Sequence, residues 1–365
     1  MSKLDLEVDL CGVHFKNPLL LSAGPPTANA EKIIEAYRQG WAGAVTKTLR
    51  LEAAVNPYPH IAAINRKNLL NAEKWSDLTY QQWIEKEIPA IKKEGIPVIV
   101  SVGHTLEEVE KIVPLVEEAG ADIIELVSYE QEGFDEMVKI AKELVSVPVL
   151  AKISPNWSDP VGISLKCEKL GADGITAIDS FGPVLSIDVE TGKPFLGSVK
   201  GEGWLSGFSI KPLAVYYVAG LASKLKIPVI GVGGIFSGKD VIEMIMAGAT
   251  CVQVCTAAIL EGIGLHKKLI QQISDFMNTH GYDKLEEIRG IALKEISKLT
   301  EEKKDKLHPV ISEEKCTLCG LCVRSCPYGA LTMGDRKVLL EIDMCQSCGL
   351  CYSVCPFNAI TLQKR

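Results

Sequence analysis

The chain has 365 residues, of which 47% are hydrophobic, and its formal net charge is −7. That length and apolar content suit one large domain with a small one and exclude a disordered chain. The negative charge argues against a nucleic-acid-binding surface. Because the start carries no secretory pattern and no apolar run could cross a bilayer, we expect a cytoplasmic protein whose twelve cysteines are not disulfides.

Residues 1–295 alternate short apolar runs with amphipathic stretches. Helical patterns such as Leu106–Glu118 follow the runs, and Thr105-x-x-Glu108 forms a capping box at one helix start. Such alternation predicts a parallel sheet, and eight units favour a (β/α)8 TIM barrel over a doubly wound open sheet. The predicted strands are Leu19–Ser22, Ala44–Thr48, Val98–Val102, Ile123–Ser128, Val149–Ser154, Gly174–Ile178, Val229–Val232 and Cys251–Thr256.

The last two barrel strands end in motifs that could hold a phosphate. The seventh ends in Gly231-Val232-Gly233-Gly234 and the eighth in Cys255-Thr256-Ala257-Ala258. Glycines let backbone N–H groups approach an anion, and this fold binds phosphate at these two places. Tight turns without a ligand are the alternative for each motif alone. Gly231-x-Gly233 lacks the third glycine of a dinucleotide fingerprint, so we expect no NAD(P)H site.

Two lysines lie at predicted strand ends, Lys47 and Lys152. A charge in an apolar strand is costly unless it is paired. A reduced flavin would offer a partner, whereas a lysine that extends out of the barrel mouth would need none. The pattern favours a ligand for Lys152 and leaves both interpretations open for Lys47.

Residues 296–312 are polar and lysine-rich and are predicted to be a linker. Residues 313–365 carry the spacing Cys-x2-Cys-x2-Cys-x3-Cys-Pro twice, which is typical of a two-cluster [4Fe–4S] ferredoxin and not of zinc sites. Because the fourth cysteine of each run reaches the other cluster, two ligand sets follow. They are Cys316, Cys319, Cys322 and Cys355, and Cys345, Cys348, Cys351 and Cys326. Residues 330–332 and 359–361 are predicted to be short paired strands.

These motifs give the chain a family resemblance. The barrel resembles the dihydroorotate dehydrogenase family, and within it the flavin-and-iron–sulfur part of bacterial dihydropyrimidine dehydrogenase. The resemblance rests on motifs in order along the chain: Asn17-Pro18, Lys47-Thr48, Lys152 with Ser154-Pro155-Asn156, Leu205-Ser206-Gly207, Gly233-Gly234-Ile235 and Val252–Ala257, and then the ferredoxin.

The resemblance implies FMN in the barrel. Carried over to this sequence, Ala23 and Gly24 would line the flavin, and Lys47 and Lys152 would contact its ring and ribityl chain. The phosphate end would be held by Gly207, Gly233, Gly234 and Thr256. Asn65 resembles the family asparagine near flavin and substrate, although a turn residue explains it equally well.

The sequence departs from the family at the catalytic residues. After the fourth strand the family asparagine and the long loop with its catalytic cysteine or serine are absent, and the chain reads Glu125-Leu126-Val127-Ser128-Tyr129-Glu130. A proton donor must lie opposite the flavin, so Tyr129, Glu130 and Ser180 are our candidates, with Asp179 and His104 also at strand ends. Each is by itself more often a surface or packing residue.

Three hypotheses follow for function. The first is an FMN- and [4Fe–4S]-dependent oxidoreductase that acts on the C=C or CH–CH bond of a small, pyrimidine-like substrate. Its electrons would be exchanged with a ferredoxin or an FAD/NAD(P)H-binding subunit. The second is an electron-transfer subunit in which flavin is only a relay, and the third is a barrel scaffold without flavin. By analogy with the family we also expect a homo-oligomer.

Overall fold

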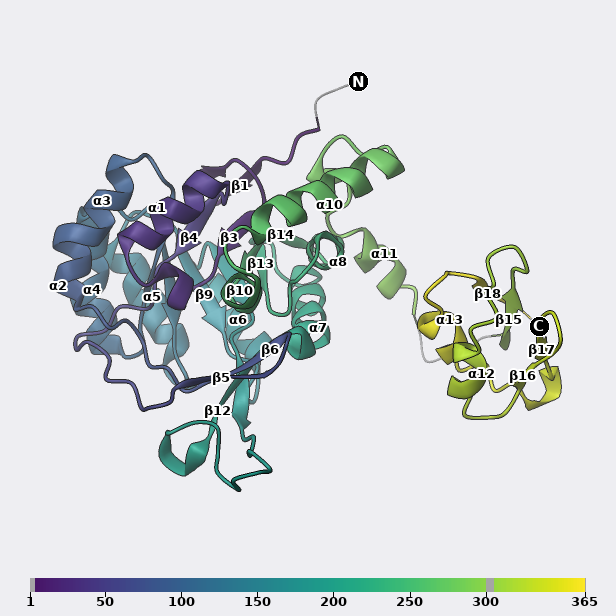
Figure 1. Cartoon of the computed structure of the whole chain (residues 1–365). Coiled ribbons are helices and arrows are strands. Elements are labelled where there is room, and N and C mark those ends of the chain that lie inside the picture. The colour runs from purple at the N-terminus through teal and green to yellow at the C-terminus, as the bar shows by residue number, and fades with distance from the viewer. Residues whose placement is uncertain (1–3, 300–304, 365) are drawn as a thin grey trace. The chain divides into compact units, whose positions relative to one another are not determined.

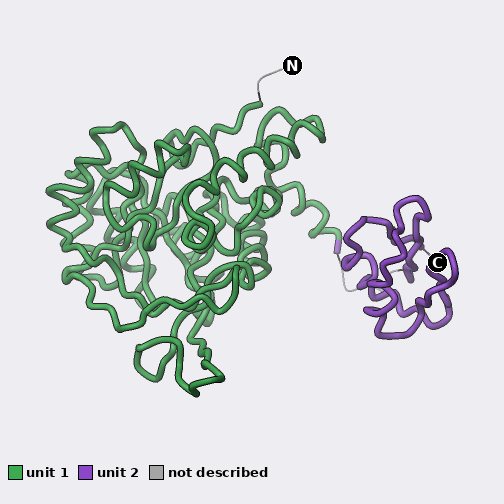
Figure 2. Tube along the Cα trace, in the orientation of Figure 1, with its two compact units in different colours: residues 1–298 green, residues 299–365 purple. Residues whose placement is uncertain are grey.

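The computed structural model describes residues 4–299 and 305–364. The chain divides into two compact units, residues 1–298 and residues 299–365 (Figure 2). Each unit has its own hydrophobic core. Among the described residues, no helix combines the length and the apolar character that crossing a membrane requires.

The first unit is built on a closed barrel of eight parallel strands, so the predicted TIM barrel is confirmed (Figure 1). Strand β14 pairs with β3 and closes the sheet. Every predicted strand is present within a few residues of its expected bounds. In chain order the strands are β3 (Leu19–Leu21), β4 (Gly43–Val45), β7 (Val98–Val102), β8 (Ile123–Val127), β9 (Val149–Ile153), β10 (Gly174–Ala177), β13 (Val229–Val232) and β14 (Ala249–Val254).

Helices surround the barrel, as expected for a fold whose strands are joined by right-handed crossovers. Local signals start several of them: Thr105 and Glu108 form the predicted capping box of α4, and Ser237 and Asp240 form another at α8. The helices are α1 (Ala30–Gln39), α2 (Tyr80–Gln82), α3 (Ile88–Lys93), α4 (Leu106–Glu118), α5 (Phe134–Leu144), α6 (Pro160–Lys169), α7 (Lys211–Ala222), α8 (Gly238–Met246), α9 (Thr256–Glu261), α10 (Leu265–His280) and α11 (Ile291–Ile296).

The barrel strands are buried along their whole length. Continuous apolar runs are the usual pattern of strands covered on both faces. Buried polar side chains interrupt that pattern, among them Glu125 on β8, Lys152 on β9 and Gln253 on β14.

An antiparallel sheet of four strands adjoins the barrel, in the order β11-β12-β6-β5. The sequence analysis did not predict it. Its strands are β5 (Ile61–Asn65), β6 (Asn68–Asn71), β11 (Phe181–Val184) and β12 (Gly203–Gly207). A hairpin of β1 (Val8–Leu10) and β2 (Val13–Phe15) lies near the start of the chain.

In its described residues, the second unit contains two short α-helices and two small antiparallel sheets. Strand β15 (Leu307–Ile311) pairs with β18 (Ile360–Lys364), and β16 (Leu331–Met333) pairs with β17 (Val338–Leu340). Helices α12 (Leu321–Ser325) and α13 (Leu350–Val354) contact each other. Two short helices and two small sheets around a compact core agree with the small ferredoxin-like fold predicted for this end of the chain.

The ends of the two units differ from the predicted boundaries. Helix α11 extends past residue 295, and residues 307–311 of the expected linker form a strand of the second unit. Residues 300–304 lie outside the described residues. The two predicted strand segments after the cysteine runs do not pair with each other, because each pairs with a neighbour that the sequence pattern did not reveal.

Candidate active site

A cleft opens at the carboxyl ends of the barrel strands. Active sites of this fold lie at that face. Segments after β3, β10, β13 and β14 line it, together with Lys152 from β9 and residues of β6 and β12. Seven of the predicted site residues meet there: Ala23, Lys152, Ser180, Gly207, Gly233, Gly234 and Thr256.

One end of the cleft is built from tight turns and small polar groups. The backbone N–H groups of Gly233 and Gly234 have no acceptor among the described residues. At Gly234 φ is +74°, and a Cβ there would lie 2.5 Å from Lys211 Cβ, so only glycine fits. Thr256 begins helix α9 and donates its hydroxyl to Ser206 Oγ at 2.8 Å. Free N–H donors beside hydroxyls form a suitable cradle for an anion.

The middle of the cleft is dominated by a buried ion pair. Lys152 Nζ lies 3.5 Å from Glu125 Oε1, and the Glu125 side chain is completely buried. Burial lowers the pKa of Lys152, but Glu125, Asp179 and Cys255 together hold that pKa above its ordinary value. Lys152 therefore presents a positive charge at the cleft. Burial also raises the pKa of the neighbouring Cys255 thiol to about 12.

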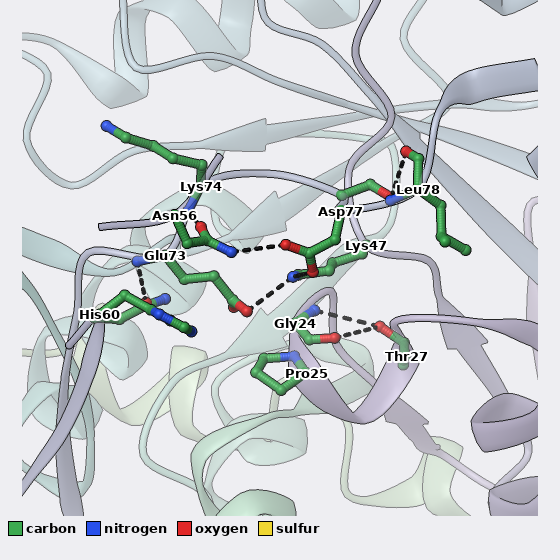
Figure 3. Close-up of polar contacts among 12 residues, drawn as sticks. Gly24, Pro25, Thr27, Lys47, Asn56, His60, Glu73, Lys74, Asp77 and Leu78 are labelled. Carbon is green, nitrogen blue, oxygen red and sulfur yellow. Dashed lines mark hydrogen bonds and ion pairs between the residues drawn. The ribbon is translucent and has the colours of Figure 1, made fainter. Parts of the chain in front are cut away.

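Lys47 is buried two residues beyond β4, and its charge is engaged by protein carboxylates (Figure 3). Its Nζ lies 2.8 Å from Glu73 Oε1 and 2.5 Å from Asp77 Oδ2. Lys47 does not line the cleft. Nor does Gly24, whose N–H donates to Thr27 Oγ1 (Figure 3). A Cβ at Gly24 would lie 2.8 Å from Cys255 Sγ.

Asn65 lies away from the cleft, at the exposed end of β5. Its Oδ1 accepts hydrogen bonds from Lys67 N at 2.8 Å and from Asn68 Nδ2 at 3.0 Å, which is the contact pattern of a turn residue. Asn71, at the end of the paired strand β6, lines the cleft instead.

The candidate proton donors fall in different places. Ser180 lines the cleft, next to Asp179. Tyr129 is packed among aromatic rings, with its ring centroid 4.7 Å from Trp75 and 5.3 Å from Trp204. Burial, with a further contribution from Asp179, raises the pKa of the Tyr129 phenol, so the group keeps its proton. Glu130 is exposed and does not line the cleft.

His104 joins the same aromatic group, 5.6 Å from Trp75 between ring centroids. Its Nδ1 is buried without a hydrogen-bond partner. Burial and the nearby Arg50 lower its pKa, so the imidazole is neutral at physiological pH. We call Trp75, His104, Tyr129 and Trp204 the aromatic cluster. It adjoins the cleft through β12, in which Trp204 pairs with the cleft residue Asn71.

The eight cysteines of the second unit surround two cavities. Among the described residues no group of three or more His, Cys, Asp or Glu side chains is placed to hold a single metal ion. One cavity is lined by Cys316, Cys319, Cys322 and Cys355, and the other by Cys326, Cys345, Cys348 and Cys351. The four cysteines that line each cavity are the four that the sequence spacing assigns to one cluster. The apolar core here is small, and two of its five buried residues are cysteines.

The cleft also contains residues to which the sequence analysis gave no individual role. Ser22, Asn71, Ser206, Gln253 and Cys255 line it, and Glu125 lies behind Lys152. One signal could have identified Glu125, because a charge inside an apolar strand is the same pattern that singled out Lys152.

The cleft has the properties that an FMN site needs. Free N–H groups and hydroxyls at one end suit a phosphate, and a lysine ammonium in the middle suits a ring that becomes anionic when reduced. The Lys152 ammonium has no hydrogen-bond partner at normal distance among the described residues, which leaves its donors available to a ligand.

Comparison with known proteins agrees with this geometry. A family model described as dihydroorotate dehydrogenase matches residues 5–277, and one described as a 4Fe-4S dicluster domain matches residues 308–356. A dihydroorotate dehydrogenase B (NAD(+)) catalytic subunit from Pyrococcus abyssi is 36% identical over 305 residues, which cover 79% of this chain and 99% of the relative. The subunit of the same name from Methanosarcina mazei is 34% identical and covers 78% of this chain and 94% of the relative. About a fifth of the chain thus has no counterpart in these relatives.

Proposed function

The chain belongs to the dihydroorotate dehydrogenase family, and on that premise we propose that it is an FMN- and [4Fe–4S]-dependent oxidoreductase of CH–CH bonds. Its substrate would be a small pyrimidine-like ring. Electrons would pass between that substrate and a partner protein by way of the second unit. The partner would be a ferredoxin or an FAD/NAD(P)H-binding subunit.

One observation carries the proposal: the cleft places a lysine charge and free backbone N–H donors together at the carboxyl ends of the strands. That is where barrels of this type perform chemistry. Gly233, Gly234 and Thr256 would bind the phosphate, with Gly207 allowing the chain to turn beside them. Lys152 would contact the ring, and Ala23 would line it.

When bound, FMN supplies hydride transfer on the substrate side and single-electron transfer on the cluster side. The protein must then hold a proton near the reacting carbon. We propose Ser180 and Tyr129 for that role, because Ser180 lines the cleft and the Tyr129 phenol stays protonated beside it. Glu130 is a weaker candidate, because its exposed side chain would have to turn toward the cleft.

The second unit would carry two [4Fe–4S] clusters, one in each cysteine-lined cavity. Each cluster passes one electron at a time, so two of them match the two electrons of a CH–CH oxidation. The names of the relatives describe catalytic subunits of NAD⁺-dependent enzymes. This supports a separate protein as the electron partner.

The test is substrate-dependent bleaching of the flavin absorbance in anaerobic full-length protein. Dihydroorotate and 5,6-dihydrouracil are the first substrates to mix with the oxidised enzyme. We expect one of them to bleach the flavin. Because that oxidation releases a proton from the substrate, proton donation is tested in the reverse direction, in which orotate or uracil reoxidises the reduced flavin. The Tyr129→Phe or Ser180→Ala variant should slow that reoxidation at least tenfold if the residue supplies the proton. A flavin that no dihydropyrimidine reduces would refute the proposed substrate class.

The aromatic cluster favours a second candidate function. Tyr129 is packed between Trp75 and Trp204 where the family has its catalytic loop, so these rings occupy space beside the cleft. A barrel with that arrangement could use flavin only to relay electrons inside a larger complex. In that case no small molecule would bleach the flavin, whereas reduced ferredoxin would.

A further inference from the structure

Glu125 is a carboxylate in the middle of an apolar strand, and no step of the proposed reaction above uses it. Its side chain is completely buried inside the barrel. Oε2 accepts hydrogen bonds from Thr176 Oγ1 and from Gln253 Nε2, both at 2.8 Å. Gln253 is held in turn by Ser22, whose hydroxyl donates to Gln253 Oε1 at 3.0 Å. Thr176 on β10 and Gln253 on β14, with Ser22 after β3 behind Gln253, thus hold the Glu125 carboxylate in place.

The other oxygen of Glu125 is directed at Lys152. Oε1 has no hydrogen-bond partner and lies 3.5 Å from Lys152 Nζ. Lys152 has no other ion pair among the described residues, and its side chain is 7% exposed, at the cleft. Lys152 therefore has the barrel carboxylate on one side and the cleft on the other.

A buried lysine without a counter-charge loses its proton readily. Three titratable groups face Lys152: Glu125 on β8, Asp179 after β10 and Cys255 after β14. Cys255 keeps its proton, because burial raises the pKa of its thiol to about 12. Asp179 is partly exposed, so water weakens its effect. Glu125 is the one charged partner that is both fully buried and in contact.

We propose that Glu125 is a positioning residue that keeps the Lys152 ammonium charged and directed into the cleft, and that it thereby sets the affinity for FMN. This inference rests on the proposed function, because it assigns to Glu125 an effect on the flavin that Lys152 would bind. Glu125 itself contacts neither flavin nor substrate.

The first experiment measures FMN affinity of the full chain from pH 6 to 9.5. Glu125→Gln removes the charge with little change in shape, and Glu136→Gln removes the same charge from an exposed site without an ion pair among the described residues. In Glu125→Gln we expect the affinity for FMN to fall about tenfold or more as pH rises. The fall should follow one deprotonation, that of Lys152, because the charged hydrogen bond from Lys152 to FMN is then lost. Wild type and Glu136→Gln should change together and by much less.

A double-mutant cycle separates this role from a loss of packing. If Glu125 acts through Lys152, adding Glu125→Gln to Lys152→Met should weaken FMN binding by less than twofold further. The inference is wrong if the fold-losses of FMN affinity in the two single variants multiply in the double variant. It is also wrong if Glu125→Gln weakens FMN binding equally at every pH. Glu125→Asp keeps the charge but moves the carboxylate away from Lys152, so its FMN affinity should lie between those of wild type and Glu125→Gln. This variant replaces Glu125→Gln in the experiment if the glutamine variant does not fold.

A second readout does not need flavin. All five tryptophans lie in the first unit, so tryptophan fluorescence follows unfolding of the barrel in the full chain. Without Glu125, desolvation should push the folded-state pKa of Lys152 below its unfolded value. The unfolded state would then bind more protons, and stability would rise with pH relative to wild type.

That relative gain should disappear in the Lys152→Met background. A stability difference independent of pH would overturn the inference even if the protein binds FMN. Wild type that binds no FMN would instead refute the proposed function, while the stability data would still decide whether Glu125 controls the charge of Lys152.

Discussion

Lys47 offers the sharpest choice between a structural role and a flavin contact. Its ammonium lies between Glu73 and Asp77, and the side chains of Lys47 and Glu73 are only 4% and 8% exposed. The Asp77 side chain is 50% exposed, so water can solvate it without the lysine. We therefore expect the Lys47→Met substitution to act through the Glu73 carboxylate, which would be left buried without a counter-charge.

The size of the effect follows from that burial. Removing one partner of a buried ion pair costs about 3–5 kcal/mol, because the remaining charge is uncompensated. We expect about 3 kcal/mol for Lys47→Met, since only one of its two partners is buried. The matched double variant Lys47→Met/Glu73→Gln should recover most of that loss, because neither charge then remains.

Urea unfolding followed by tryptophan fluorescence measures these differences, and an FMN titration on the same samples measures the ligand. The double variant should bind FMN within about threefold of wild type, a factor that corresponds to a minor contact. A Lys47→Met variant that keeps wild-type stability but no longer binds FMN would refute this account. It would mean that Lys47 leaves its carboxylates and serves the flavin, as the family resemblance implies.

Three other outcomes follow from the structure. Burial lowers the pKa of His266 from 6.5 to about 4, so between those pH values the unfolded chain binds more protons than the folded barrel. The free energy of unfolding should therefore fall by about 3 kcal/mol as pH drops through that window, which urea unfolding at each pH measures. Replacing Cys355 with serine should damage the cluster held by the first cysteine run, and Cys326→Ser the other, as distinguished by electron paramagnetic resonance of the reduced protein. Gly234→Ala should cost about 2 kcal/mol and weaken FMN binding, because the new Cβ meets Lys211 at a positive φ.

Each of these has a clear contrary result. Stability that stays constant from pH 7 to 4.5 would mean that His266 takes up a proton in the fold without penalty. Loss of the same signal in both cysteine variants would contradict the exchange of the fourth ligand between clusters. A Gly234→Ala variant with normal stability and FMN affinity would show that the turn after β13 is not the phosphate cradle.

The sequence predicted the barrel well for a physical reason. Strands buried on both faces are continuous apolar runs, so their number and order are visible without a structure. The repeated cysteine spacing carried equally direct information, because cluster geometry fixes which four cysteines meet. The antiparallel sheet and β15 were not predicted, because their strands are short and their apolar and polar residues do not alternate regularly in the sequence.

The site residues were harder to place, because their partners are distant in the sequence. Lys47 is paired by carboxylates 26 and 30 residues further along the chain, and no local pattern reveals that meeting. Asn65 and Asn71 lie on two strands of one hairpin, and only the fold shows that Asn71 lines the cleft. Glu125 was visible as a charge in an apolar strand, but its contact with Lys152 depends on the register in which β8 and β9 pair.

We propose that a flavin in the barrel exchanges electrons with two clusters in the second unit. The decisive measurement is acid-released FMN and iron per chain in anaerobically purified protein. We expect one FMN and about eight irons, the content of two cubanes. Eight irons without flavin would contradict it, and would leave a cluster-bearing electron carrier attached to a barrel that binds no FMN.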